Sequence, residues 1–98
     1  MPRSSETTSP RTSETTATLP ADVDLHARPA AQFVRTALGF RAQIAVAAGD
    51  READAKSLLS VLALGAKAGT TLRLRADGDD GPVAVEALGR CVAGLTDQ

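Results

Sequence analysis

Three stretches of the chain space their apolar residues as in a helix that covers a core. In the first stretch these residues recur at i, i+3, i+4, i+7 and i+8, and they are Ala30, Phe33, Val34, Ala37 and Leu38. Pro29 suits a first helical turn, and Gly39 suits the position after the last turn. The pattern predicts a helix that begins within a residue or two of His26.

The second stretch predicts a short helix over Ser57–Leu64, which Gly65 ends. Ser57 is a favoured N-cap residue. Apolar side chains surround this helix almost completely, and they are Leu58, Leu59, Val61, Leu62 and Leu64. One face can pack on a sheet, and we expect the other to stay exposed because the domain is small. An exposed apolar patch of this kind marks a docking surface.

The third stretch predicts a helix that follows residues 79–82, which read Asp-Asp-Gly-Pro. Its apolar stripe consists of Ala84, Ala87, Leu88, Cys91, Val92 and Leu95. Cys91 is the only cysteine, so the chain can form no internal disulfide and no cysteine-cluster metal site. We expect Cys91 to fill the core on this helix.

Alternating apolar and polar residues predict the strands. Thr71–Ala76 alternates cleanly, with Leu72 and Leu74 on the inner face. Gln43–Ala47 also alternates, and Gly49 and Asp50 offer a turn into a short strand at residues 51–54. A further short strand is predicted from Thr16 to about Pro20. The order is therefore βαββαβα, which is typical of an α+β domain with helices on one face of a mostly antiparallel sheet.

Composition divides the chain into two parts and limits its partners. Residues 1–14 are rich in Ser, Thr, Pro, Glu and Arg, so we expect a disordered tail there and a folded domain over residues 15–98. The net charge of −1 and the absence of Trp and Tyr give no sign of nucleic-acid binding. No apolar run is long enough to span a bilayer. We expect a cytoplasmic protein that does not insert into membranes.

The most informative residue is His26, the only histidine, which falls at the predicted helix start with Arg28 two residues on. A helix N-terminus presents unpaired N–H groups and a positive dipole end, so it favours anions. A neutral imidazole is a nucleophile, and a guanidinium grips phosphate oxygens in a fork. A plain surface histidine near a helix cap is the other interpretation. A metal site would have to rest on carboxylates almost alone, and the chain lacks the Gly-x-Ser-x-Gly motif of a hydrolase.

Two motifs resemble those of a known family. Residues 25–34 read LHARPAAQFV, which resembles the active-site signature of HPr, the histidine phosphocarrier of the bacterial phosphoenolpyruvate:sugar phosphotransferase system. Residues 55–65 read AKSLLSVLALG and are similar to the regulatory-serine helix of that family. The resemblance continues through residues 69–78, GTTLRLRADG, to the last helix, and covers about residues 16–95.

The resemblance implies an open-faced β-sandwich of four antiparallel strands with three helices on one side. It implies that His26 is phosphorylated on Nδ1 by phospho-enzyme I and then donates to the A components of sugar permeases. Arg28 would stabilise the phosphoryl group, and Ser57 matches a serine that an HPr kinase/phosphorylase modifies in some members. The partner surface it implies consists of Ala31, Arg35, Leu58, Leu59 and Leu62.

One residue departs from the family pattern, because Asp24 stands where the family usually has glycine before the Leu-His pair. A carboxylate there is expected to repel a phosphoryl group on His26 and to favour its onward transfer. We expect a monomeric phosphoryl-relay protein that needs no cofactor or metal and turns over no small molecule of its own. The alternative is a regulatory paralogue that binds proteins through the Ser57–Leu64 helix.

Overall fold

Residues 11–97 are described by the structure, a computed structural model of the chain. Their elements follow the predicted order βαββαβα. The strands are β1 (Thr12–Thr18), β2 (Gln43–Ala48), β3 (Arg51–Asp54) and β4 (Thr71–Asp77), and the helices are α1 (Ala27–Ala37), α2 (Leu58–Ala63) and α3 (Gly81–Ala93). The predicted α+β class and the open-faced β-sandwich are confirmed.

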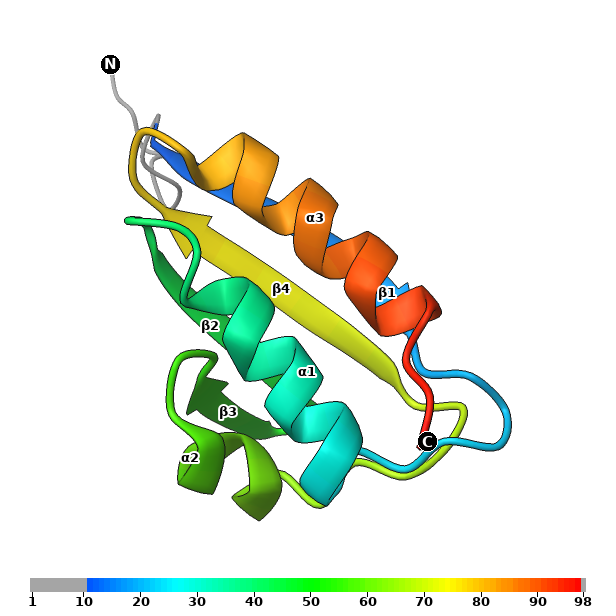
Figure 1. The fold of residues 1–98 in the computed structure, drawn as a ribbon. Coiled ribbons are helices and arrows are strands. Elements are labelled where there is room, and N and C mark those ends of the chain that lie inside the picture. Colours follow the sequence, from blue (N-terminus) through cyan, green and yellow to red (C-terminus); the bar gives the residue numbers. More distant parts are fainter. Residues whose placement is uncertain (1–10, 98) are drawn as a thin grey trace.

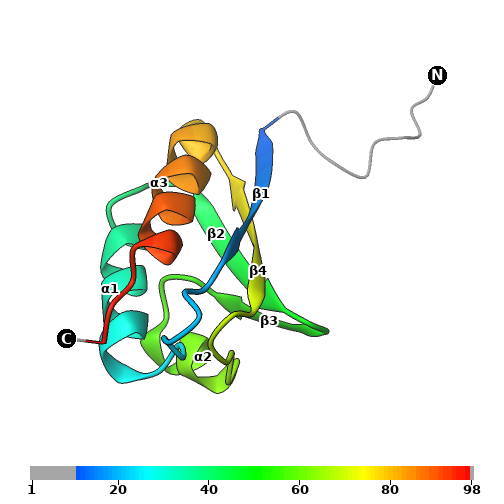
Figure 2. The same ribbon diagram turned by 90° about the vertical axis from the view of Figure 1, so that its right-hand side faces the viewer.

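The four strands form one antiparallel sheet in the order β1-β4-β2-β3. The three helices lie on one face of this sheet, with α1 and α3 side by side along the strands (Figure 1). The opposite face carries no helix, as the view from the side shows (Figure 2). The chain therefore builds two layers with a single core between them.

The central strand β4 shows most clearly how sequence pattern becomes core. Leu72, Leu74 and Ala76 are buried under the helices, and the residues between them are exposed on the open face. Phe33 of α1 is fully buried above this sheet. The apolar side chains on the inner face of the strand thus pack against the apolar stripe of the helix above it, and together they form one core layer.

Strand β1 begins at Thr12, four residues before the predicted start at Thr16, so that boundary was wrong. It pairs with β4 from Thr12 opposite Asp77 to Thr18 opposite Thr71. Its residues that alternate toward the helices are small, so they carry no apolar signal. Residues 12–14 of the expected tail thus lie in the sheet, and residues 1–10 lie outside the described residues.

Helix α3 comes close to strand β1, whose inward-facing residues are small. A Cβ added at Gly81, the first residue of α3, would lie 3.1 Å from the Ala76 carbonyl oxygen and 3.3 Å from Ser13 Oγ. The helix start therefore rests almost directly on the β1–β4 pair. This contact explains why an element without large apolar side chains still belongs to the sheet.

Two residues that the sequence places in the core are less buried than expected. Leu38, the last residue of the predicted α1 stripe, is the C-cap residue and is 59% exposed, whereas the preceding Ala37 is fully buried. Cys91 is half-buried and packs against the core, and the Thr36 hydroxyl lies 3.5 Å from its sulfur. Among the described residues no helix is long and apolar enough to cross a membrane.

Candidate functional site

His26 is the N-cap residue of α1, where the sequence places it. Its backbone carbonyl accepts the Ala30 N–H at 2.8 Å, whereas its side chain makes no capping hydrogen bond. The neighbouring Leu25 is buried, and the His26 side chain is 58% exposed. The backbone is thus held by the helix and the core, while the imidazole faces solvent.

Hydrogen-bond donors gather at this end of α1. The first N–H groups of the helix, those of Ala27 and Arg28, precede its first internal bond and point out of the helix end. Pro29 follows with no N–H of its own. The Arg28 side chain is exposed and makes no hydrogen bond or ion pair within residues 11–97. Its guanidinium is therefore available to an anion bound at His26.

A carboxylate that the sequence did not reveal also faces the imidazole. Asp97 Oδ2 lies 3.9 Å from His26 Nε2. The segment after α3 returns to the start of α1, where the Gln32 side chain donates to the Thr96 carbonyl at 3.0 Å (Figure 1). Asp97 Oδ2 and His26 Nε2 are too far apart for a hydrogen bond, so the carboxylate acts on this site through its charge. No local pattern signals this contact, because it depends on where the C-terminal segment packs.

The Asp24 carboxylate binds a neighbouring loop. Its Oδ1 accepts the backbone N–H of Ala68 at 2.6 Å, so the carboxylate binds the loop between α2 and β4. None of the described residues other than glycine has a positive φ, so Asp24 occupies ordinary backbone geometry. The conformational freedom of glycine is not needed at this position.

Ser57 is the N-cap of α2, and its Oγ accepts the Ser60 N–H at 3.2 Å. The capping interpretation of this serine is therefore confirmed. The hydroxyl is half-buried at the start of a six-residue helix. Its expected modification by a kinase stays a prediction.

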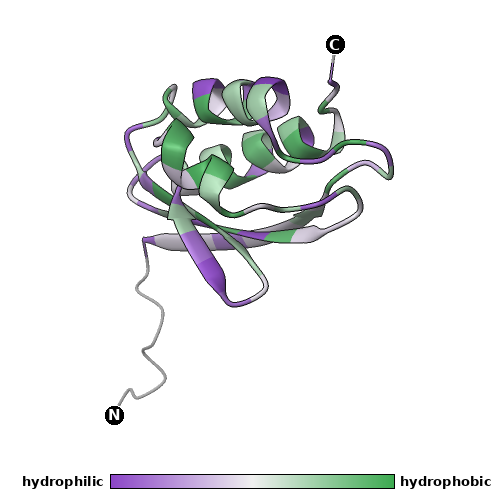
Figure 3. Cartoon of the chain, turned by 90° about the horizontal axis from the view of Figure 1, so that it is seen from below, coloured by the Kyte–Doolittle hydropathy of each residue, from purple (hydrophilic) through white to green (hydrophobic). Residues whose placement is uncertain are grey.

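The expected partner surface spans α1 and α2. Arg35 is exposed and Ala31 half-buried on α1. On α2, Leu59 is 81% exposed and Leu58 is 40% exposed, whereas Leu62 is half-buried against the core. In the view from below, α2 faces the reader and is coloured largely as hydrophobic (Figure 3). We call Leu58 and Leu59 the α2 patch.

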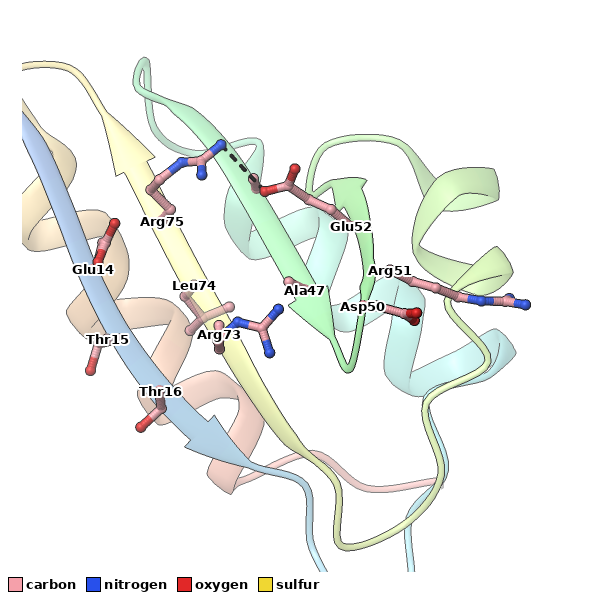
Figure 4. Close-up of a pocket in the computed structure, with 11 residues that line it drawn as sticks. Glu14, Thr15, Thr16, Ala47, Asp50, Arg51, Glu52, Arg73, Leu74 and Arg75 are labelled. Carbon is pink, nitrogen blue, oxygen red and sulfur yellow. Dashed lines mark ion pairs between the residues drawn. The ribbon is translucent and has the colours of Figure 1, made fainter. Parts of the chain in front are cut away.

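A hollow of about 450 Å³ lies on the open face of the sheet, away from the helices (Figure 4). Arginine side chains in this hollow already have partners. Arg75 Nη2 lies 3.3 Å from Glu52 Oε2 in an ion pair, and Arg73 Nη2 donates to the backbone carbonyl of Gly49 at 2.7 Å. His26 does not line this hollow. Within residues 11–97 no group of three or more His, Cys, Asp or Glu side chains could hold a metal ion.

Comparison with known proteins assigns the family. The family model described as "PTS HPr component phosphorylation site" matches residues 13–93. The chain belongs to the HPr family. It is 48% identical over 64 residues to the phosphocarrier protein HPr of Haemophilus influenzae, a match that covers 65% of this chain and 75% of that protein.

Further matches agree with this assignment. The chain is 46% identical over 74 residues to a multiphosphoryl transfer protein of Xanthomonas campestris, a match over 76% of this chain but 9% of that longer protein. A crystal structure of HPr-C-His from Thermoanaerobacter tengcongensis superposes with a TM-score of 0.77 at 39% identity, covering 82% of this chain and 90% of that one. This HPr is a phosphocarrier protein of the phosphotransferase system.

Proposed function

We propose that this HPr carries the phosphoryl group on His26. The observation that supports the proposal most directly is the exposed imidazole at the N-cap of α1, next to the first N–H groups of the helix. Arg28, two residues on, is exposed and has no partner within residues 11–97. These donors suit the three oxygens of a phosphoryl group. We assign the reaction to Nδ1, as the family resemblance implies, and Asp97 lies 3.9 Å from the other ring nitrogen.

The proposed relay has two displacements at phosphorus. Nδ1 of His26 forms a bond to phosphorus as the bond from phosphorus to phospho-enzyme I breaks, and enzyme I keeps the electron pair of the broken bond. In the second displacement a nucleophile on the A component of a sugar permease attacks the same phosphorus. The N–P bond then breaks, and its electron pair returns to Nδ1. The protein is regenerated and consumes no small molecule of its own.

Partner docking is proposed for the surface around this site. The α2 patch and Arg35 combine exposed apolar area with a positive charge, and α2 packs against α1, whose first residues hold the site. Such a surface suits a partner with an apolar groove and acidic rim. We propose that enzyme I and the permease A components share it, and that phosphorylation of Ser57 by an HPr kinase/phosphorylase weakens docking there.

Mass measurement after incubation with phosphoenolpyruvate and enzyme I tests the proposal. Wild-type protein is expected to gain one acid-labile phosphate, whereas His26→Ala gains none and unfolds at the wild-type temperature. Leu38→Ala, at the exposed far end of the same helix, is a control that keeps the histidine. An acid-labile phosphate on His26→Ala would remove His26 from the relay.

The second candidate function is protein binding without phosphoryl transfer, which the 81% exposure of Leu59 favours. Wild-type protein that gains no phosphate but binds a partner, and loses that binding in Leu59→Ser, would indicate such a regulatory paralogue. A cytoplasmic location and a monomeric state stay predictions. Cell fractionation and sedimentation check them.

A further inference from the structure

Two loops lie side by side below the sheet in Figure 1, one leading from β1 to α1 and the other from α2 to β4. Main-chain hydrogen bonds join them at three points. Leu19 N–H donates to the Thr70 carbonyl at 2.9 Å, Gly69 N–H to the Pro20 carbonyl at 3.1 Å, and Leu25 N–H to the Ala66 carbonyl at 2.9 Å. The loop that ends at His26 is therefore held by its neighbour.

Asp24 adds a side-chain bond at the point nearest His26. Its Oδ1 accepts the Ala68 N–H at 2.6 Å, and its backbone carbonyl accepts the His26 N–H at 3.0 Å. The flanking Val23 and Leu25 are both buried. One residue thus connects the neighbouring loop to the amide of the histidine.

We propose that Asp24 is a positioning residue for His26. Its carboxylate bond to Ala68 fixes the last turn of the loop, so the imidazole is presented at one place relative to the N–H groups of α1. This inference rests on the proposed role of His26. In-line displacement at phosphorus depends on the placement of the attacking nitrogen, so a loosened loop lowers the rate.

The bond involves an ionised acceptor, which makes it stronger than a neutral main-chain bond. It also engages one carboxylate oxygen at the neighbouring loop. Glycine, which the family usually has here, has no side chain to make this bond. The chain therefore replaces a flexible residue with an anchored one directly before the Leu-His pair.

Four variants separate anchoring from charge. Asp24→Asn keeps an oxygen acceptor for Ala68 but carries no charge, whereas Asp24→Ala loses the acceptor. Asp22→Ala is the matched control, because Asp22 lies in the same loop, is exposed and makes no hydrogen bond or ion pair within the described part of the chain. His26→Ala tests the proposed function itself.

The measurements are kcat and KM for transfer from phospho-enzyme I, and hydrogen exchange of the Ala68 amide. Asp24→Ala is expected to lower kcat by about three- to tenfold with little change in KM, and to speed Ala68 exchange, because one charge-assisted bond is lost. Asp24→Asn, which keeps a neutral acceptor, is expected to lose clearly less than Asp24→Ala, and Asp22→Ala is expected to stay within about twofold of wild type. Recovery by Asn, with a change in kcat alone, distinguishes positioning from general destabilisation.

Three results would overturn the inference. Wild-type kcat in Asp24→Ala with faster Ala68 exchange would show that the bond does not position His26. Equal changes in kcat for Asn and Ala would assign the effect to charge. Unchanged Ala68 exchange in Asp24→Ala would show that the bond is absent in solution. A phosphate on His26→Ala would instead refute the proposed function, whatever the Asp24 variants do.

Discussion

Charged residues close to His26 in sequence or in space differ in what their side chains contact. Arg28 makes no hydrogen bond or ion pair within residues 11–97, Asp24 binds Ala68, and Asp97 Oδ2 lies 3.9 Å from the imidazole. Arg28 is the cation of the three and has no partner in the described part of the chain, so it can bind an anion without breaking an existing bond. The roles of these residues therefore follow from their charge together with the partners they already have.

Replacing Arg28 with alanine is expected to slow transfer without abolishing it. In the proposed role the guanidinium would stabilise the phosphoryl group by about 1–3 kcal/mol, and the N–H groups of α1 stay in place without it. Arg28→Lys keeps the charge but not the forked geometry, so we expect an intermediate rate. Rapid-quench transfer from phospho-enzyme I measures the effect. An alanine variant as fast as wild type would exclude Arg28 from the site.

Asp97→Asn is expected to raise the phosphorylated fraction of His26 at equilibrium with phospho-enzyme I. A phosphoryl group on the ring brings close to two negative charges within about one Debye length, 8–10 Å, of this carboxylate. Removing the repulsion favours the phosphorylated form most at low salt. Asp97→Glu serves as the control that keeps the charge. The charge argument fails if the Asn and Glu variants give equal fractions.

At the scale of single residues, the sequence predicted those positions that a local pattern determines. His26 and Arg28 lie within one short motif at a helix start, so their placement follows from the helix alone. Asp97 could not be found in this way, because its contact requires the chain after α3 to return to the start of α1. The partner of Asp24 likewise lies on a loop whose path no local pattern describes.

Among the elements, those with a turn or cap signal at their start were predicted best. The β3 bounds are as expected, and α2 lies between its predicted cap at Ser57 and Leu64. The predicted start of strand β1 was wrong because the residues that face the helix layer there are Ser and Thr, which give no apolar pattern. The exposure of Leu38 was also missed, since periodicity identifies a face of a helix but not the residue at which the helix ends.

The start of α2 responds differently to the two substitutions at Ser57. Ser57→Ala removes the bond from the Ser60 N–H and is expected to cost about 0.5–2 kcal/mol of unfolding free energy. Ser57→Asp keeps an acceptor and adds favourable charge at the helix start, so its melting temperature should equal or slightly exceed that of wild type. Beside the α2 patch the same charge should weaken binding of enzyme I. Calorimetry at low salt measures this, and equal affinity would place Ser57 outside the interface.

Two glycines of α3 give opposite expectations for one substitution. Gly89 has open space around its missing Cβ, so Gly89→Ala is expected to stabilise the fold by about 0.5–1 kcal/mol through helix propensity. At Gly81 the new Cβ would lie 3.1 Å from the carbonyl of Ala76 in the centre of the sheet. Gly81→Ala is therefore expected to destabilise by about 1–3 kcal/mol. Urea unfolding measures both, and equal shifts would refute the close approach.

For the whole molecule, one carboxylate joins the loop after α1 to the start of α3. Asp80 accepts the Arg41 N–H at 2.8 Å and the Ala42 N–H at 2.9 Å. The bond from the Arg41 N–H is the main cause that lowers the pKa of Asp80 below its usual 3.8. The charged form is therefore favoured in the folded protein, and the two helices are linked through it.

This link makes part of the stability depend on pH. Because the folded pKa of Asp80 is lowered, its contribution is present above the usual value of 3.8 and is lost as pH falls through the folded pKa. Asp80→Asn is expected to be less stable than wild type at neutral pH and to approach it in acid. Asp22→Asn is the control, because that carboxylate is exposed and makes no hydrogen bond or ion pair within the described residues. Urea unfolding across this range tests the link, and a difference that stays constant with pH would contradict it.

The position of β4 between β1 and β2 has a consequence for synthesis on the ribosome. Strand β1 has no hydrogen-bonded neighbour until Thr71–Asp77 has been made, since β2 pairs only with β3 and β4. A nascent chain that ends before β4 can form the β2–β3 hairpin and local helices, but not the sheet. We expect this domain to fold only after β4 has been made, with its long-range pairing as the slow step.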